Sequence, residues 1–564
     1  MIPVRRSHPE LARLSQDFFA LRHSIDPFNA TMLGVAGFDD QVPDPSRAAA
    51  AGNARRVAAI EQAAARLDPS TLDEDDATDR EVLVALAGAD RADLEQGSWE
   101  ANASADGYGS PQGEAFMAVA AASLVDAAAV EGYLRRLGAL GPFFDAVGRR
   151  YREAAADGRR PTAVGVHQAV EQLRGHLSGA VFQRPTLPPG VDHEHTRARI
   201  AATVDDVVRP AMRWLTAILD EELGPVARPD EEVGMSFVPG GADAYRAAVR
   251  RHTTTDLTPE EIHGIGHGVL AGLREEWLEL AGTVLGTTDV PSTLERLRRD
   301  PSLRFTTEAE IVEVVTAALA RAEAVRDRWF PHYDIADCTV EQIDPVEAGN
   351  AALAHYRPPS ADGSRPGAHC VLTVDPQQRF TYEYEALAFH ESTPGHHLQI
   401  ASAQQLPHLP AYRRFLDAEV CAYVEGWGLY SERLADEMGL YSSDMQRLGM
   451  LSFDALRACR LVVDTGMHHL GWSRRLAIDF MWANTATTRH NVVNEVNRYI
   501  AWPGQALAYL IGRREIVRLR TAAEQRLGPG FDLRGFHGAV LSNGAVPLGV
   551  LEQVVLRWAD ALSP

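Results

Sequence analysis

Residues 390–399, HESTPGHHLQ, form the densest group of side chains able to do chemistry in this sequence. Glu391 follows directly on His390, and His396 and His397 stand six and seven positions after His390. Imidazole nitrogens bind zinc in enzymes, and a glutamate beside such a ligand can take a proton from water. We therefore predict that His390 and His396 bind a divalent metal, with His397 open as the alternative second ligand. Glu391 is the predicted general base.

The spacing of these histidines does not suit an unbroken helix. At about 100° per residue, His396 would lie about 240° around the axis from His390, and His397 would lie about 10 Å further along it. A Pro-Gly pair separates them, beginning at Pro394. Proline disfavours helical geometry at Thr393 and removes a backbone donor, so Thr393 can cap a new turn. We expect a break that brings His396 back beside His390.

A catalytic zinc takes three protein ligands and leaves one position for water, so a third ligand should come from another helix. The segment VEGWGLYSE, residues 424–432, offers Glu425 and Glu432. These two glutamates are seven apart and therefore share one helix face. Gly426 and Gly428 would let the helix approach a neighbour closely.

These residues carry a family resemblance. HESTPGHHLQ, followed by AYVEGWGLYSE, resembles the motifs HExxPGHxxQ and EGWxLYxE of the bacterial domain-of-unknown-function family 885, which is grouped with the zincin-like metallopeptidases. The resemblance continues through RLVVDTGMHHLGW, RYIAWPGQALAYLIG and FHGAVLSNGAVPL, so it is strong over about the last 210 residues and weak before them. It implies Glu425 as the third ligand, with Glu432 and His397 supporting the ligands, and it does not fix a substrate.

Hydrolysis also needs a donor for the oxyanion that develops on the attacked carbonyl. Tyr499, Tyr509, His468 and His490 are the candidates, and the family pattern slightly favours Tyr509. A substrate carboxylate would be bound by arginine, because the sequence contains no lysine. Arg365 and Arg498 are the predicted partners, since a guanidinium binds a carboxylate through two hydrogen bonds.

The composition excludes several classes of protein. All 55 basic residues among the 564 are arginine, which excludes Schiff-base chemistry on a lysine and a P-loop. The net charge of −22 argues against a nucleic-acid partner. Four cysteines without a CxxC pair make a disulfide scaffold improbable. The N-terminus resembles no signal peptide and the apolar stretch 116–130 is too short for a bilayer, so we expect a cytoplasmic protein without a membrane partner.

Helical periodicity dominates the chain, with clear examples at 47–67, 311–329 and 415–437. The clearest strand is HCVLTV, residues 369–374, which could pair with an extended peptide. We predict a mostly α, zincin-like architecture with a small β element beside the active-site helix. Proline-rich segments at 184–191 and 358–367 are candidate boundaries. We expect an N-terminal helical region, 1–345, and a catalytic region, 346–564, which can share one core.

A second histidine pair, His263 and His267, stands one helical turn apart in EEIHGIGHGVL. Its spacing permits metal binding, but without a glutamate of the HExxH kind the sequence favours a structural or surface role.

The leading functional prediction is a hydrolase with one zinc ion, or another divalent metal, that cleaves peptides or small amides. One alternative keeps the metal and takes esters or modified amino acids as substrates. Another is a catalytically silent metal-binding interaction protein, against which the intact Glu391 beside His390 argues.

Overall fold

The alanine-, leucine- and arginine-rich segments fold into long capped helices in the computed structural model. Helix α3 (Arg47–Ala65) and helix α13 (Glu308–Trp329) match predicted helices, and a capping box at Thr307 begins the second of them. Helix α17 (Cys421–Glu437) occupies most of the segment predicted at 415–437. The prediction of a mostly α protein is therefore confirmed.

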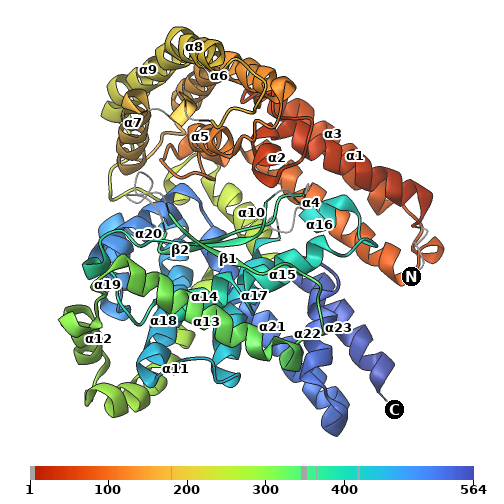
Figure 1. The fold of residues 1–564 in the computed structure, drawn as a ribbon, viewed down its shortest axis with the longest axis vertical. Helices are drawn as coiled ribbons and strands as arrows, with labels where there is room; N and C mark the ends of the chain where they lie inside the picture. Colours follow the sequence, from red (N-terminus) through yellow and green to blue (C-terminus); the bar gives the residue numbers. More distant parts are fainter. Residues whose placement is uncertain are drawn as a thin grey trace.

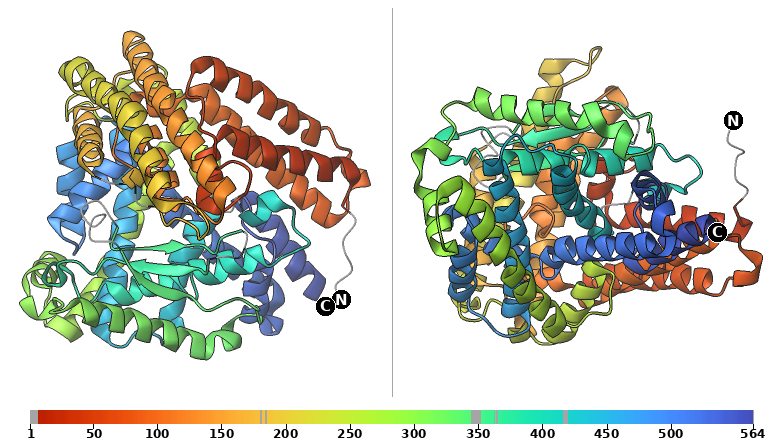
Figure 2. Two further views of the ribbon diagram at one scale, coloured as in Figure 1. Left: turned by 45° about the horizontal axis from the view of Figure 1, so that its top comes forward. Right: turned by 90° about the horizontal axis from the view of Figure 1, so that it is seen from below.

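The structure describes residues 7–563 except 180, 184, 344–351, 362, 364 and 416–419. Helices α1 to α9 form a layer over one side of the C-terminal half, as Figures 1 and 2 show. The helices that precede the sheet, apart from α3 and α13, are α1 (Pro9–Ile25), α2 (Pro27–Leu33), α4 (Glu74–Gln96), α5 (Pro111–Ala121), α6 (Ala127–Ala156), α7 (Ala163–Ser178), α8 (His193–Thr203), α9 (Arg209–Ala217), α10 (Gly241–Thr253), α11 (Pro259–Leu285) and α12 (Val290–Arg299).

The proline-rich segment 184–191 does not separate two domains. Leu187, within it, is buried in a hydrophobic cluster that also holds Phe116 from α5 and Leu215 from α9. Prolines end helices without ending a core, and here the chain continues into the same layer after them. The prediction of a boundary at this loop is therefore wrong, and residue 184 itself lies outside the described residues.

The two predicted regions contribute to one hydrophobic core. A single cluster holds Leu11 and Val82 from the first region together with Leu398 and Trp427 from the second. The predicted boundary at 345–346 falls outside the described residues. The shared core means that helices from the N-terminal layer help to fix the C-terminal helices in place.

A three-stranded sheet lies next to helices α13 and α14, as Figure 1 shows. Its order is β1-β3-β2, with β1 parallel and β2 antiparallel to β3. Strand β3 overlaps the strand predicted at 369–374. It is paired on both edges, so it cannot accept a peptide strand by edge pairing, which corrects that expectation. The strands are β1 (Thr339–Gln342), β2 (Ala354–Arg357) and β3 (Ala368–Val371).

Helices after the sheet form the centre of the C-terminal half. None of the helices in the described part of the chain combines the length and apolarity that a bilayer span requires. Besides α17, these helices are α14 (Tyr384–Glu391), α15 (His396–Gln404), α16 (Ala411–Phe415), α18 (Asp444–His468), α19 (Arg474–Asn484), α20 (Arg489–Ala501), α21 (Ala508–Leu527), α22 (Leu533–Leu541) and α23 (Leu548–Leu562).

Candidate metal centre

The two predicted histidine ligands stand on separate short helices. His390 lies near the end of α14, and His396 is the first residue of α15. Gly395 is suited to the turn between them because a β-carbon there would stand 1.8 Å from the carbonyl oxygen of His390. The two imidazole rings lie at 84° to each other with centroids 4.7 Å apart. The predicted break in the helix, and the return of His396 to His390, are confirmed.

Contacts with distant helices, rather than a local cap, hold this turn. The hydroxyl of Thr393 donates to Oε1 of Glu323 on α13 at 2.5 Å, and α15 begins without a side-chain cap. On the opposite side, Nε1 of Trp427 on α17 donates to the carbonyl oxygen of Pro394 at 2.9 Å. The expectation that Thr393 caps the second helix is therefore wrong, because its hydroxyl is bound by a tertiary partner instead.

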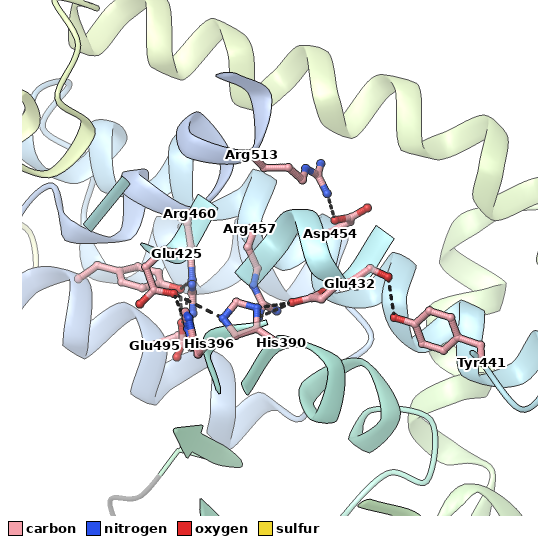
Figure 3. A network of polar contacts seen from close by, with 11 residues as sticks. His390, His396, Glu425, Glu432, Tyr441, Asp454, Arg457, Arg460, Glu495 and Arg513 are labelled. Carbon is pink, nitrogen blue, oxygen red and sulfur yellow. Dashed lines mark hydrogen bonds and ion pairs between the residues drawn. The ribbon is translucent and has the colours of Figure 1, made fainter. Parts of the chain in front are cut away.

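Three potential ligand atoms from three helices meet at one place, as Figure 3 shows. The Nε2 atoms of His390 and His396 each lie 3.4 Å from Oε2 of Glu425, and the three atoms all lie within 4.8 Å of one another. A tetrahedral ion with bonds of about 2.0–2.1 Å holds its ligand atoms about 3.3–3.4 Å apart. Oε2 of Glu425 is buried without a hydrogen-bond partner among the described residues. This donor set therefore fits a divalent cation such as zinc.

His397 points away from this place. Its Nδ1 lies 3.0 Å from the hydroxyl of Tyr356 on β2, and its Nε2 lies 2.9 Å from the carbonyl oxygen of Ala336. Burial lowers the pKa of His397 to about 4, so its imidazole is neutral. One position along a helix is a rotation of about 100°, which separates His397 from its neighbour. His396 is thus the second histidine of the cluster, and the predicted support of the ligands by His397 is wrong.

Glycines let helix α17 lie directly against the imidazole rings. A β-carbon at Gly428 would stand 2.8 Å from Nε2 of His390 and 3.0 Å from Cε1 of His396. At Gly426 a β-carbon would stand 2.6 Å from the α-carbon of Gly512 on α21. The predicted close approach of α17 is confirmed both toward the histidine rings and toward α21. This close approach places Glu425 beside the histidines.

Glu432 fixes the orientation of His390. Its Oε1 lies 2.8 Å from Nδ1 of His390, and its side chain is fully buried. Nη2 of Arg457 donates to the same oxygen at 3.3 Å. A carboxylate that accepts from the Nδ1 hydrogen leaves the lone pair of Nε2 free for a metal ion. The predicted contact of Glu432 with a ligand is therefore confirmed.

We expect the substitution Glu432→Gln to raise the dissociation constant for zinc by about 10–100-fold, because the neutral amide is a weaker acceptor for His390 and leaves Arg457 without a counter-charge. Isothermal titration of the metal-free protein measures this constant. The matched control is Glu437→Gln, on the same helix but paired with Arg520 near the surface. This control should leave the dissociation constant for zinc unchanged. Equal constants for wild type and the Glu432 variant would contradict the assignment.

The charges of the cluster suit a cation. Burial acts to lower the pKa of His390, but contacts with Glu425 and Glu432 outweigh burial and raise this pKa to about 9. Burial likewise acts to raise the pKa of the Glu425 carboxyl, and its contacts with His390 and His396 instead hold the pKa well below its usual range. The pocket therefore concentrates negative charge around two imidazoles, as a site for a divalent cation requires.

Glu391 ends helix α14 with a carboxylate that is available for proton transfer. Its side chain is buried, with 9% exposed, and it forms no hydrogen bond or ion pair with another described side chain. A general base needs an oxygen that is not already occupied by a donor. The charge of Glu391 acts on its neighbour His390 in the cluster.

His369 on β3 is a neighbour of this base that the sequence alone does not single out. It is fully buried, its Nδ1 lies 3.1 Å from the hydroxyl oxygen of Ser392, and its Nε2 has no hydrogen-bond partner among the described residues. Burial lowers its pKa to about 4, although the charge of Glu391 opposes the change. A neutral imidazole therefore stands beside the turn, and only its place in a predicted strand could have indicated it.

Tyr509 lies against the cluster from α21. Its ring is stacked on that of His390, with centroids 6.3 Å apart and planes at 20°. Burial raises the pKa of Tyr509 and the charge of Glu425 raises it further, so its phenol stays protonated. A protonated phenol beside the ligands can donate a hydrogen bond to an oxyanion. The geometry is consistent with the role that the sequence predicts for Tyr509.

The profile of one family matches residues 27–555, and that family is described as bacterial proteins of unknown function, DUF885. This chain belongs to the DUF885 family. It is the family that the motifs at 390–399 and 422–432 resemble. No curated protein matches the chain.

Two solved structures share the fold of this DUF885 protein. A "putative lipoprotein" from Colwellia psychrerythraea is 27% identical, with a TM-score of 0.91 over 98% of this chain and 99% of that one. A "putative lipoprotein of unknown function" from Shewanella oneidensis is 17% identical, with a TM-score of 0.75 over 97% of this chain and 100% of that one. The likeness extends over the whole chain, so the helices that form the candidate site belong to a shared fold.

Two of the predicted oxyanion donors of the DUF885 chain are occupied by other contacts. The hydroxyl of Tyr499 accepts from Nε of Arg460 at 2.8 Å and donates to Glu495. His468 is bound by backbone on both sides, since its Nδ1 accepts from the amide of Met235 at 3.2 Å and its Nε2 lies 3.0 Å from the carbonyl oxygen of Tyr499. Because these groups have no free donor, we withdraw both as catalytic candidates.

The remaining predicted residues differ in their surroundings. His490 is exposed on α20 and lies 3.1 Å from the amide nitrogen of Asn494, which suits a surface residue. Nη1 of Arg498 donates to Oε1 of Gln505 at 2.7 Å, and the charge of this guanidinium acts on Tyr509. The charge of Arg365 acts on Glu341 at the sheet. Substrate binding by either arginine stays a prediction, and Arg498 is the one placed beside a candidate catalytic residue.

Asp464 on α18 holds the loop that leads to Tyr509. Its Oδ1 accepts from the hydroxyl of Tyr245 at 2.6 Å, and both of its oxygens lie 3.2 Å from the amide nitrogen of Gly504. Gly504 has a φ of +82°, a backbone conformation that favours glycine. Burial raises the pKa of Asp464 to about 7. This carboxyl therefore retains its proton in the folded protein well above the pH at which an exposed aspartate loses it.

This raised pKa predicts a pH-dependent loss of stability that Asp464→Asn removes. The unfolded chain releases the proton near pH 4, whereas the folded protein holds it to about pH 7. The stabilisation that the folded protein gains from this difference in pKa is therefore fully present below pH 4. As the pH rises to 7 it is lost, which lowers the free energy of unfolding by roughly 4 kcal/mol. The free energy of unfolding, measured with urea at pH 5 and at pH 8, should differ less between the two pH values in the variant than in wild type. Parallel pH profiles for the two proteins would contradict this prediction.

Proposed function

We propose that this protein is a metal-dependent hydrolase that cleaves peptide or small amide bonds with a divalent cation, zinc in the first instance, held by His390, His396 and Glu425. The observation that supports the proposal most strongly is the meeting of two imidazole Nε2 atoms and one carboxylate oxygen within 4.8 Å of one another, with each nitrogen 3.4 Å from that oxygen. The uncommitted carboxylate of Glu391 directly after a ligand adds to it. A scaffold that only binds a metal has no use for such a base.

When bound, the cation supplies Lewis-acid chemistry that polarises a carbonyl and makes water acidic. Glu391 takes the proton of the attacking water and gives it to the amine that leaves. Glu432 keeps Nδ1 of His390 occupied, so the imidazole presents Nε2 to the ion. The residues that hold the ion and the residue that moves the proton are therefore different side chains, as hydrolysis with a general base requires.

Tyr509 donates a hydrogen bond to the oxygen on which negative charge develops. Its phenol is kept protonated by burial and by the nearby charge of Glu425. Arg460 also fixes the ring, with its guanidinium carbon 4.2 Å from the ring centroid. A donor already oriented before the reaction stabilises the transition state without reorganisation.

Metal analysis combined with a mixed peptide library tests this proposal. We expect about one tightly bound divalent ion per chain, hydrolysis of a subset of peptides, loss of hydrolysis with a chelator and recovery on adding zinc. Including ester and N-acyl amino acid substrates in the same assay distinguishes the amide from the alternative substrate classes. Stoichiometric metal without hydrolysis of any of these substrates would contradict the proposal and favour a metal-binding protein.

The partners and location proposed for this enzyme follow from its charge and chemistry. We propose peptide or small amide substrates and no nucleic-acid partner, since the net charge is −22. A cytoplasmic location stays a prediction, and the two similar solved structures carry the name "putative lipoprotein". Fractionation of cells that express the full-length protein tests the location.

A further inference from the structure

A second group of histidines lies where helices α11 and α18 pack against each other, in the lower part of Figure 1. His263 and His267 stand one turn apart on α11, and their Nε2 atoms are 3.3 Å apart. That distance is close to the roughly 3.3–3.4 Å between two ligand atoms of a tetrahedral ion. Both rings are reachable from solvent, because His263 is half-buried and His267 is exposed.

The partners of His263 orient its Nε2 toward Nε2 of His267, with which it forms a hydrogen bond. Nδ1 of His263 lies 2.8 Å from Oγ1 of Thr465 on α18. The hydroxyl hydrogen of Thr465 is already donated to the carbonyl oxygen of Leu461, at 2.6 Å. With the hydroxyl hydrogen placed there, Nδ1 of His263 donates to Thr465, and the lone pair on Nε2 of His263 accepts from Nε2 of His267. This is the arrangement by which a supporting residue prepares a histidine to bind a metal.

The surroundings hold both rings in place. The ring of His263 meets the edge of Trp472 at a centroid distance of 5.5 Å, and the ring of His267 meets Phe480 at 5.6 Å. His469, which directly follows the last residue of α18, lies close enough to His263 for their charges to interact. Its Nε2 is 2.6 Å from Oε1 of Glu260, one turn before His263.

We propose that His263 and His267 form a second metal site, separate from the candidate catalytic centre, for a first-row divalent cation that prefers imidazole, such as zinc or copper(II). Water completes the coordination. Two fixed ligands bind more weakly than the three of the catalytic cluster, and copper(II) should bind more tightly than zinc in a nitrogen site of this kind.

Titration of the metal-free, full-length protein with zinc tests the proposal, with copper(II) electron paramagnetic resonance as a second readout. Wild type should bind two ions with different affinities. His267→Gln, which changes an exposed side chain, should raise the weaker dissociation constant about tenfold or more and leave the tighter one unchanged. In a His390→Ala, His396→Ala double variant the weaker site should remain, and its copper spectrum should show coupling to imidazole nitrogen.

The double substitution His193→Gln, His195→Gln on α8 is the matched control, because these two histidines are exposed and two positions apart on their helix, so they face different directions. Circular dichroism and thermal unfolding check that each variant folds as wild type does. A single ion that disappears in the His390, His396 variant and is unaffected by His267→Gln would overturn the second site and leave the proposed function standing. A single ion lost only with His267→Gln would uphold the second site and refute the proposed function.

Discussion

The substitution Glu391→Gln should reduce hydrolysis by about 10²–10⁴-fold while the protein still binds its metal ion. Glutamine has almost the same shape as glutamate but cannot accept a proton at neutral pH. The side chain is buried and forms no hydrogen bond with another described side chain, so the substitution removes no such bond. Initial rates on any peptide substrate found in the library, measured beside the zinc content of each sample, check this prediction.

The matched control for this variant is Glu385→Gln on the same helix, α14. Glu385 is also buried, but it pairs with Arg321 and accepts from the amide of Ser442, so it has a structural position away from the ligands. We expect this control to lose stability and to keep its activity at temperatures where it is folded. An active Glu391→Gln protein would refute the base assignment, whereas loss of both metal and activity would indicate a structural role for Glu391.

The turn between the two histidine ligands could be predicted from the sequence because its cause is local. A spacing of six residues excludes convergence on a straight helix, and Pro394 and Gly395 are residues that end one. The shared orientation of the two carboxylates on α17 could also be predicted, because residues seven positions apart lie on one face of a helix. The imidazole of His390 lies between them, with Nε2 at Glu425 and Nδ1 at Glu432.

The errors concern side chains whose partners are distant in the sequence. His397 is bound by Tyr356 and the carbonyl of Ala336, and no local pattern shows that these segments lie next to α15. His468 is bound by Met235, which is 233 positions away. The role of a histidine in a helical protein thus depends on which helices pack against it. For the same reason the sequence does not indicate His369, whose contact with Ser392 arises only when the sheet packs against the turn.

A single added methyl group at Gly428 should disrupt the metal centre. In Gly428→Ala the new carbon would lie 2.7 Å from Cε1 and 2.8 Å from Nε2 of His390, well inside ordinary contact distance. Helix α17 cannot retreat, because at Gly426 it is already in contact with the backbone of α21. The imidazole rings must therefore move, and the spacing of 3.4 Å to Glu425 is lost. We expect zinc affinity to fall by at least about 10–100-fold, as when a residue that orients a ligand is removed.

Gly138→Ala on α6 separates this effect from the general consequence of placing alanine in a helix. A β-carbon at Gly138 would meet no atom within 4 Å, so this control should gain up to about 1 kcal/mol of stability and bind zinc as wild type does. Titration with zinc and thermal unfolding of both variants provide the comparison. Wild-type zinc affinity in Gly428→Ala would mean that His390 and His396 do not hold the ion at the position deduced from their Nε2 atoms. A weakened affinity in a protein that unfolds at its normal temperature would instead locate the ion between these rings and Glu425, because only atoms in direct contact with the new methyl group would have moved.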